Sequence, residues 1–564
     1  MQKIWNIIKN NTKSVEQFSE SLNISPILAK ILINRNLTDV KEARDFLFGD
    51  ISSTFDPFLL KGMDKAVARI KEALNKREHI MVYGDYDVDG ISSIALLKII
   101  FRQLGRDVLT YIPNRLEEGY GLNKKAVEFA RDKRISLIIT ADCGIGAIEE
   151  VDLANSFGID VIVTDHHEIK KDKMPEAHSI INPHQAGCAY PFKHLAGVGI
   201  AYKLAQALMK KKYYPLEEHL DLVALGTVAD IVPQKGENRV FTKLGVARLN
   251  ETNKAGLKSL ISAAGIGKRD ISTSDIGYVL GPRINAMGRI GSPDIALNLL
   301  LTDNKVEADK LAGILNQENR NRQRIEKEIL EEAISMVERD INFKEHRVIV
   351  LAKEGWHAGV IGIVSSRIQE KYYRPAILIA IEDDVGKGSA RSIDNFNLFN
   401  ALINSKEYLI DFGGHEAACG LSIYRKDIDK FNEEINKYAK ENIKDADLLP
   451  KLDIDIDMPL SELNFDLINE LELLKPYGPD NPRPVFLSSG IALRNEPKFI
   501  ARNGFKIWVS SGSVTCEAIS FRRELMEVPK AGQTVDIAYS PSINNWQGID
   551  SIQLDLCDIK IRLP

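Results

Sequence analysis

The first part of the chain consists of short segments with apolar residues at helical spacing. VEQFSESL, SPILAKILI and VKEARDFLF each place their apolar side chains three or four residues apart. This spacing predicts an N-terminal helical segment over residues 1–60.

From about residue 77 the pattern alternates between short apolar runs and amphipathic stretches. The runs IMVYG, DVLTYI, SLIITAD and DVIVTD are separated by ISSIALLKIIFRQL, LNKKAVEFARD and AIEEVDLANSFG, which have helical spacing. Such alternation is typical of a doubly wound, mainly parallel β-sheet. Helical patterns dominate from about 195 onward, so we expect a first α/β domain over residues 61–300.

The rest of the chain predicts a connector, a second α/β domain and a β-domain. A long, highly charged helix is expected within residues 301–342, and HRVIVLA, ILIAIE and LSIYR are expected strands of a second α/β domain over 343–448. After PYGPDNPRPVF the pattern is mostly strands, which favours an OB-like β-barrel with its linker over 449–564. The expected fold class is therefore α/β, with two lobes of mainly parallel sheets joined by a long helix, plus this barrel.

Composition narrows the class of protein. With 564 residues the chain is expected to form several domains. Its net charge of −5 argues against a histone-like polyelectrolyte but permits a local basic groove. The five scattered cysteines include no CxxC pair, the N-terminal residues lack the apolar core of a secretory signal, and no stretch has the length of a membrane span. We therefore expect a cytoplasmic protein.

Acidic side chains gather where the apolar runs end. Asp85, Asp87 and Asp89 follow IMVYG, Asp142 ends SLIITAD, and Asp165, His166 and His167 end the run DVIVTD. Because the carboxyl ends of parallel strands meet at one edge of a sheet, these groups are expected to converge. A further acid, Asp230, lies in ALGTVADIVP.

Carboxylates with one or two imidazoles and no thiolate form a hard set of ligands. Such a set suits Mn²⁺ or Mg²⁺, and two such ions can support phosphodiester hydrolysis. The alternative is that each aspartate merely caps the helix that follows it. Capping explains any one of these positions, but it explains four acidic clusters at the ends of successive apolar runs far less well.

Four motifs resemble the phosphoesterase motifs of the DHH superfamily in their RecJ form. They are GDYDVDG (84–90), ADCG (141–144), TDHHE (164–168) and GTVADIVP (226–233). IPNRLEEGYGL (112–122), LAGVG (195–199) and GPRINAMGRI (281–290) also resemble RecJ sequences, and GGHEAACG (413–420) resembles the glycine-rich motif of the DHHA1 domain. The chain is thus identified as a member of the RecJ family of single-stranded-DNA-specific exonucleases.

The resemblance implies roles for individual residues. Two divalent ions, Mn²⁺ or Mg²⁺, would be held by Asp87, Asp89, Asp142, His166 and Asp230, with Asp142 between them. Asp85 and His167 would be catalytic residues next to the ligands or in contact with phosphate. The chain departs from many family members at Tyr83, where they have histidine, so one metal site is expected to be weaker or completed by water.

A second group of residues is expected to bind phosphate. Glycines in GGHEAACG let backbone N–H groups approach a phosphate, and His415 is a candidate hydrogen-bond donor, although the glycines could simply form a turn. Ser389 and Arg391 lie two apart on an extended segment. By resemblance, a pocket for the terminal 5′-phosphate would consist of Arg115, Arg289, Ser389 and Arg391, although any single arginine could be only a solvated surface charge.

Aromatic residues of the C-terminal β-domain are candidate stacking platforms for unpaired bases. Trp508 and Trp546 are the main candidates, together with Phe521 and Tyr539. The alternative is that they are core residues, as most aromatics in β-strands are.

The resemblance implies a single-stranded-DNA-specific 5′→3′ exonuclease that releases 5′-mononucleotides in DNA recombination and repair. A monomer that works with a single-strand-binding protein and a helicase is expected. The first alternative is a DHH phosphodiesterase for short oligoribonucleotides or small nucleotides, against which the additional β-domain counts. The second is a catalytically inactive DHH scaffold, which only Tyr83 favours because the other ligand positions are intact.

Overall fold

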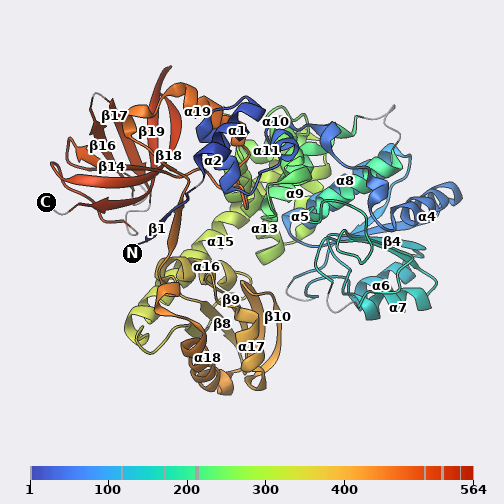
Figure 1. Ribbon diagram of the computed structural model, residues 1–564. Helices are drawn as coiled ribbons and strands as arrows, with labels where there is room; N and C mark the ends of the chain where they lie inside the picture. Colours follow the sequence, from blue (N-terminus) through green and yellow to red (C-terminus); the bar gives the residue numbers. More distant parts are fainter. Residues whose placement is uncertain are drawn as a thin grey trace. The chain divides into compact units, whose positions relative to one another are not determined.

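The computed structural model describes residues 3–9, 11–115, 118–169, 173–209, 215–267, 269–500, 504–512, 514–521, 526–546 and 548–562. The chain forms two compact units (Figure 1). The parallel-sheet unit contains Asp39–Arg320 and Leu473–Pro482, and the barrel unit contains Met1–Thr38, Asn321–Glu472 and Arg483–Pro564.

The parallel-sheet unit is built on a five-stranded sheet with the order β3-β2-β4-β5-β6. All its strand pairs are parallel, which confirms the prediction for this domain. The strands are β2 (Ile80–Gly84), β3 (Leu109–Tyr111), β4 (Leu137–Ala141), β5 (Asp160–Thr164) and β6 (Ser179–Ile181).

Alternate residues of these strands enter two cores on opposite faces of the sheet. Val82 and Ile139 belong to a large core shared with α4 (Met63–Lys76) and α5 (Val88–Gln103). Met81 and Ile138 belong to a second core shared with α6 (Lys124–Asp132) and α7 (Ile148–Ser156). Since both faces are buried, the strands contain continuous apolar runs instead of alternating polar positions.

Helices extend the larger core beyond the sheet. They are α8 (Gly197–Leu208), α9 (Leu220–Ala229), α10 (Gly236–Asn250), α11 (Ala255–Ala264), the π-helix η5 (Ile276–Leu280), α13 (Gly281–Ile290) and α14 (Pro293–Leu301). The same unit also contains α3 (Val40–Phe48) and α12 (Thr273–Asp275). The long helix predicted from the charged stretch is α15 (Lys305–Asp340), and the boundary between the two units falls within it.

The barrel unit contains a second α/β domain whose sheet has the order β10-β11-β9-β8-β7. Its strands are β7 (Ile349–Glu354), β8 (Ala376–Glu382), β9 (Val385–Arg391), β10 (Leu409–Gly414) and β11 (Ala418–Tyr424). Its helices are α16 (Ile361–Tyr372), α17 (Leu398–Asn404) and α18 (Ile428–Asn442).

The prediction of a mainly parallel second sheet is wrong. Only β7 and β8 pair in parallel, whereas β8–β9, β9–β11 and β10–β11 are antiparallel. The reason is local, because only Asp383 and Asp384 join β8 to β9, and Asp383 adopts a φ of 53°. Such a short turn joins antiparallel strands only, since a parallel pair requires a long crossover.

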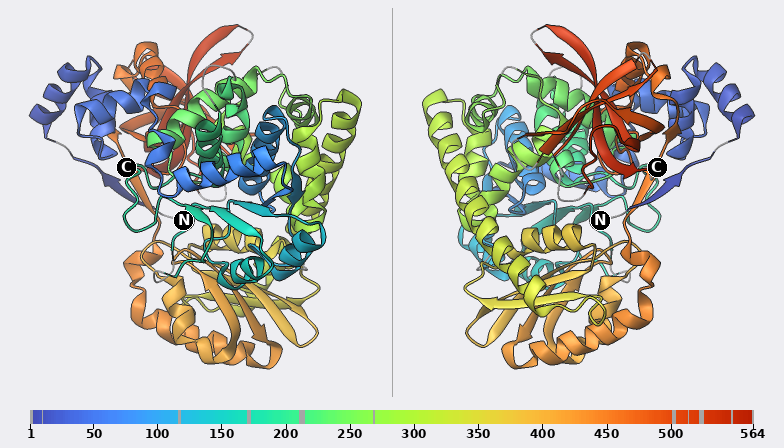
Figure 2. Two further views of the ribbon diagram at one scale, coloured as in Figure 1. Left: turned by 90° about the vertical axis from the view of Figure 1, so that its right-hand side faces the viewer. Right: turned by 90° about the vertical axis from the view of Figure 1, so that its left-hand side faces the viewer.

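The C-terminal strands form the predicted barrel, in orange to red in Figures 1 and 2. β14 (Phe486–Leu493), β18 (Thr534–Trp546), β19 (Ile549–Ile561), β17 (Val514–Ser520) and β16 (Gly504–Ser511) are paired in this order, and a β14–β16 pairing closes the ring. The short strands β13 (Ile456–Asp457) and β15 (Lys498–Ile500) lie at its margins, and α19 (Phe465–Leu471) precedes it.

The N-terminal segment contains the predicted helices α1 (Thr12–Leu22) and α2 (Pro26–Asn34) and, in addition, a strand that was not predicted. This strand, β1 (Ile4–Ile7), pairs in parallel with β12 (Lys451–Ile454) ahead of the barrel. Within the described part of the chain, no helix has the length and apolar character needed to cross a membrane.

Candidate metal centre

The first acidic cluster lies between β2 and α5. Asp87 caps α5, because its Oδ1 accepts hydrogen bonds from the backbone nitrogens of Asp89 (2.9 Å) and Gly90 (3.1 Å). The capping alternative is therefore correct for one oxygen of this residue. The capping bonds leave Oδ2 for another role.

Asp89 is held by the N-terminus of α8. Its Oδ2 accepts a hydrogen bond from Gly197 N (2.7 Å) and its Oδ1 from Val198 N (2.8 Å), where the helix dipole favours an anion. Burial, and then the charge of Asp87, raise the pKa of Asp89 to about 7 despite these bonds. A Cβ on Gly226 would lie 2.7 Å from Asp89 Oδ1, so only glycine lets α9 approach this carboxylate.

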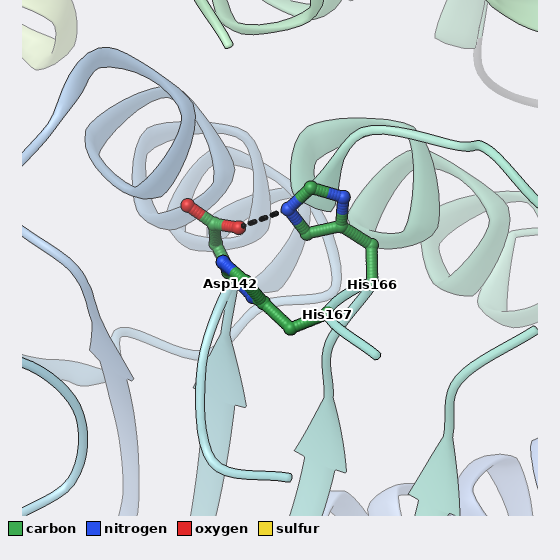
Figure 3. A group of neighbouring side chains, drawn as sticks. All are labelled: Asp142, His166 and His167. Carbon is green, nitrogen blue, oxygen red and sulfur yellow. Dashed lines mark ion pairs between the residues drawn. The ribbon is translucent and has the colours of Figure 1, made fainter. Parts of the chain in front are cut away.

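Asp142 follows β4 with a φ of 64° and is 3% exposed. Its Oδ1 lies 3.2 Å from His166 Nε2 (Figure 3). The same nitrogen lies 3.6 Å from Asp230 Oδ2. Burial and the nearby charges of Asp89, Asp87 and Asp230 raise the pKa of Asp142 well above its ordinary value. A Cβ on Gly197 would lie 2.5 Å from Asp142 Oδ1, so any larger residue at position 197 would collide with this carboxylate.

The adjacent histidines have opposite electrostatic environments. Burial and the neighbouring His167 lower the pKa of His166 to about 4, so its imidazole is neutral and suited to binding a cation. Burial alone would lower the pKa of His167, but the hydrogen bond and charge of Asp165 outweigh it and raise that pKa. The Nδ1 of His167 lies 2.7 Å from Asp165 Oδ1.

The predicted ligands, together with Asp85 and His167, form three overlapping groups of ligand atoms. Within each group the atoms lie no more than 4.8 Å apart. The groups are Asp89, His166 and Asp230; Asp85, Asp87 and Asp142; and Asp142, His166 and His167. Asp142 and His166 each belong to two of them. Of the two, only the Asp142 carboxylate has two oxygens, which suits a residue between two ions.

Several of these atoms are buried without a hydrogen-bond partner among the described residues. They are Asp85 Oδ1, Asp142 Oδ1, His166 Nε2 and Asp230 Oδ2. Leaving a buried polar atom unpaired is costly, and several carboxylates at close range repel one another. Divalent cations with a preference for oxygen ligands would satisfy both conditions, so the residues fit Mn²⁺ or Mg²⁺.

The structure shows contacts of Asp85 and Tyr83 that the sequence does not predict. Asp85 lies in one ligand group with Asp87 and Asp142, close enough to bind the same ion directly. Tyr83 is fully buried, stacks on Tyr111, and donates its hydroxyl hydrogen to Gly121 O at 2.6 Å. Its hydroxyl thus supports the loop before α6.

Tyr83→Phe is expected to leave Mn²⁺ affinity unchanged and to lower the free energy of unfolding by about 1–2 kcal/mol, because it removes the hydrogen bond to Gly121 O and the one that the hydroxyl accepts from Asn123 Nδ2 at 3.3 Å. Isothermal titration calorimetry and urea unfolding measure the two quantities. A clear loss of Mn²⁺ affinity in this variant would instead make the Tyr83 hydroxyl part of the metal centre.

Two of the predicted phosphate-binding arginines lie beside this centre. The guanidinium of Arg115 is 5.3 Å from the ring centroid of Tyr86, within the first acidic motif. Burial raises the pKa of Tyr86 to about 12, and the charges of both Arg115 and Arg289 oppose that rise. Backbone packing is close here too, since a Cβ on Gly288 would lie 2.5 Å from Tyr86 O.

The other predicted phosphate-binding residues belong to the barrel unit. Arg391 donates to Ser389 Oγ at 3.3 Å, and these two residues of β9 pair with Ala418 and Gly420 of the GGHEAACG hairpin. His415 is exposed at the turn of that hairpin. The expectation that Arg115, Arg289, Ser389 and Arg391 share one pocket remains a prediction.

The aromatic candidates have different environments. Trp508 is half-buried, with the ammonium groups of Lys498 and Lys506 each 5.1 Å from its ring centroid. Phe521 is 57% exposed. Tyr539 is fully buried and stacks on Phe486, so its expected role as a base platform is wrong. The side chain of Trp546 lies outside the described residues.

Three residues that orient parts of this centre receive no role from the sequence. Asp165 holds His167 and also accepts a hydrogen bond from Ile145 N at 2.8 Å. The hydroxyl of Tyr120 lies 3.1 Å from His167 Nε2. Asn285 Oδ1 accepts a hydrogen bond from Val88 N at 3.2 Å. The motifs TDHHE, GYGL and GPRINAMGRI contained them, but a motif does not tell which of its residues orient the others.

Comparison with known proteins agrees with this geometry. The sequence matches the DHH family, N-terminal domain, over residues 79–227, the DHHA1 domain over 345–441 and the RecJ OB domain over 454–558. It is 38% identical over 561 residues to the single-stranded-DNA-specific exonuclease RecJ of Bacillus subtilis, an alignment that covers 99% of this chain and 71% of that protein.

The chain belongs to the RecJ family. The RecJ of Escherichia coli is 33% identical over 561 residues, covering 95% of this chain and 96% of that protein. The crystal structure of RecJ from Thermus thermophilus with Mn²⁺ superimposes with a TM-score of 0.83 at 29% identity, covering all of this chain and 80% of that one. A structure of the same RecJ with Mg²⁺ gives a TM-score of 0.79.

Proposed function

We propose that this chain is a single-stranded-DNA-specific 5′→3′ exonuclease that releases 5′-mononucleotides and acts in DNA recombination and repair. The observation that carries the proposal is the convergence of three overlapping ligand groups at one edge of the parallel sheet in a RecJ-family chain. Two divalent cations, Mn²⁺ or Mg²⁺, would neutralise charge at the scissile phosphate and favour attack by water.

The residues of this centre have separate roles in the proposed reaction. Asp87, Asp89, Asp142, His166 and Asp230 would hold the cations, and Asp142 would be the ligand that both ions share. The N-terminus of α8 fixes the Asp89 carboxylate in one orientation, and the neutral His166 offers a lone pair at Nε2. Because these groups are already in place, little reorganisation accompanies substrate binding.

Asp85 and His167 are proposed to act on the substrate. Burial and the charge of Asp87 raise the pKa of Asp85, which makes its carboxylate a stronger base for the proton of the attacking water. The raised pKa of His167 favours the imidazolium, which donates a hydrogen bond to a non-bridging phosphate oxygen.

Further contacts would hold the end of the strand. We assign the terminal 5′-phosphate to Arg115, Arg289, Ser389 and Arg391, and a substrate phosphate to His415, since arginines bind phosphate with directed hydrogen bonds. Trp508 and Trp546 are the proposed stacking residues for unpaired bases. Single-strand-binding protein and helicase are the proposed partners of a cytoplasmic monomer.

The proposal is tested with purified full-length protein and single-stranded DNA labelled at the 5′ or the 3′ end, in Mn²⁺, Mg²⁺ or chelator. The 5′ label is expected to appear at once as mononucleotide, while the 3′-labelled strand shortens progressively. Asp89→Asn should abolish the reaction. Asp152→Asn, an exposed aspartate on α7, is the matched control and should keep it.

Other substrates separate the alternatives. Blunt duplex should resist cleavage, and RNA of the same sequence reports the selectivity for DNA. Cleavage restricted to dinucleotides would instead favour the small-substrate phosphodiesterase. Absence of cleavage with every metal would contradict the proposal and favour the scaffold.

A further inference from the structure

The parallel-sheet unit includes a loop that comes from a distant part of the chain. This loop, Leu473–Pro482, belongs to that unit, although the residues directly before and after it belong to the barrel unit. It lies between α19 and β14 in the sequence. Neither the metal ligands nor the proposed substrate contacts include any residue of this loop.

Arg239 of α10 binds the backbone of the first half of the loop. Its guanidinium donates hydrogen bonds to the carbonyl oxygens of Leu473 (2.8 Å), Leu474 (2.9 Å), Lys475 (2.7 Å) and Pro476 (3.3 Å), and to that of Phe46 (2.6 Å). Arg239 is 2% exposed, and its guanidinium carbon lies 3.8 Å from the ring centroid of Phe46. Burial of this cation is tolerable only because the carbonyl groups replace its water shell.

Asn481 fixes the second half of the loop against the first. It is fully buried, and its Nδ2 donates to Leu474 O (2.8 Å) and Pro476 O (2.7 Å). Gly478 and Asn481 exchange backbone hydrogen bonds of 3.0 Å in both directions. The loop therefore has one defined shape.

The loop contacts the segment that follows the metal ligand Asp230. Pro479 O accepts a hydrogen bond from Gln234 N at 2.8 Å, and Asp480 Oδ2 lies 3.4 Å from Lys235 Nζ. A Cβ on Gly478 would lie 2.5 Å from Gln234 Cγ, so the loop packs closely on that side chain. A further bond from Thr273 Oγ1 to Tyr477 O (3.0 Å) holds the loop on another side.

The segment between Asp230 and Gln234 needs such support. Asp230 directly follows α9, and Ile231 then adopts a φ of 61° and is 71% exposed. This conformation costs a β-branched residue about 1–3 kcal/mol and persists only where the surroundings enforce it. Before this segment, the backbone nitrogen of Asp230 donates a hydrogen bond to Gly226 O of α9. After it, the backbone nitrogen of Gln234 donates to Pro479 O of the loop.

We propose that the loop Leu473–Pro482 is a positioning element of the metal centre, which fixes the backbone after Asp230 and thereby the direction of its carboxylate. This inference rests on the proposed function, since it concerns the same centre. The loop residues touch neither metal nor substrate, so their effect is expected on metal affinity first.

The test uses the full chain with Asn481→Ala, which removes the clamp within the loop, and Thr273→Val, a milder isosteric change. Calorimetry with Mn²⁺ alone measures affinity, and the exonuclease rate is followed against Mn²⁺ concentration. Asn481→Ala is expected to weaken Mn²⁺ binding about tenfold to a hundredfold, as loss of a group that orients a metal ligand does. The rate should recover at high Mn²⁺, and Thr273→Val should shift the affinity in the same direction by less.

The matched control is Asn250→Ala in the same unit. Its amide also joins a helix end to a loop, through bonds with the nitrogen (2.7 Å) and oxygen (3.2 Å) of Ile271. This variant is expected to lower the melting temperature and leave Mn²⁺ affinity unchanged. Wild-type Mn²⁺ affinity in folded Asn481→Ala, or an equal loss in Asn250→Ala, would overturn the inference. An inactive wild-type protein would instead overturn the proposed function.

Discussion

Asp142→Asn is expected to lower the rate of single-stranded DNA cleavage by at least about 10³-fold, because metal charge stabilisation supplies several kcal/mol at the transition state and each 1.36 kcal/mol is a factor of ten. Asp142 belongs to two of the three ligand groups, so its loss affects both. The amide keeps the shape of the side chain but offers no charge to a cation.

The same variant is expected to be more stable than wild type when metal is removed. Burial and the charges of Asp89, Asp87 and Asp230 disfavour the Asp142 carboxylate, and the neutral amide relieves this repulsion. Thermal unfolding in chelator should give a higher melting temperature for Asp142→Asn than for wild type, and excess Mn²⁺ should reverse the order. The control Asp152→Asn should change neither rate nor melting temperature. Cleavage by Asp142→Asn at near wild-type rate would show that the ions do not depend on this residue.

Lys203→Met is expected to lower the free energy of unfolding by about 3–5 kcal/mol, the usual effect of removing one partner of a buried ion pair. The Lys203 and Glu237 side chains are 0% and 1% exposed, and Lys203 Nζ lies 2.6 Å from Glu237 Oε1. Lys203 also donates to Phe55 O at 2.8 Å. Without the lysine, the Glu237 carboxylate would remain buried with only the donors Tyr190 and Phe55 N.

Urea unfolding of the double variant Lys203→Met/Glu237→Gln provides the control. The double variant removes both charges, and the amide oxygen of the glutamine can still accept the hydrogen bond from Phe55 N. Most of the lost free energy of unfolding should therefore return. A single variant that loses less than about 1 kcal/mol would place this pair in the class of weak, solvated ion pairs.

The place where Asp85, Asp142 and His166 meet could be predicted because it follows from strand direction, whereas Asp230 follows the helix α9 and was placed only by the resemblance. The apolar runs before Asp85 and Asp142 are buried on both faces, which is the pattern of a parallel sheet, and their carboxyl ends necessarily meet at one edge. Gly197 and Gly226 lie within the sequence motifs, but only the structure shows why both positions need glycine. A Cβ at Gly197 would meet the carboxylate of Asp142, and one at Gly226 would meet that of Asp89.

The predictions failed where the structure depends on the geometry of a turn or on the direction of a side chain. Two residues between β8 and β9 make the second sheet largely antiparallel, and nothing in the apolar pattern of those strands distinguishes this from a crossover. The sequence also gives no sign that the Tyr83 hydroxyl donates to Gly121 O, and the expectation of a weaker metal site there remains a prediction. Tyr539 was considered as a platform although the register of β18 places it in the barrel core. Tyr120 contacts His167 although the two residues are 47 positions apart in the sequence, and no sequence pattern predicts such a contact.

The discontinuous parallel-sheet unit constrains how this protein can be shortened or recombined in evolution. A chain that ended before residue 473 would retain every proposed metal ligand, but Arg239 would lose four carbonyl acceptors and keep that of Phe46. Relatives that lack the C-terminal β-domain would therefore need a neutral residue at the position of Arg239, or another segment in place of the loop. An exchange of β-domains between family members should succeed only when residues 473–482 are inherited together with α10.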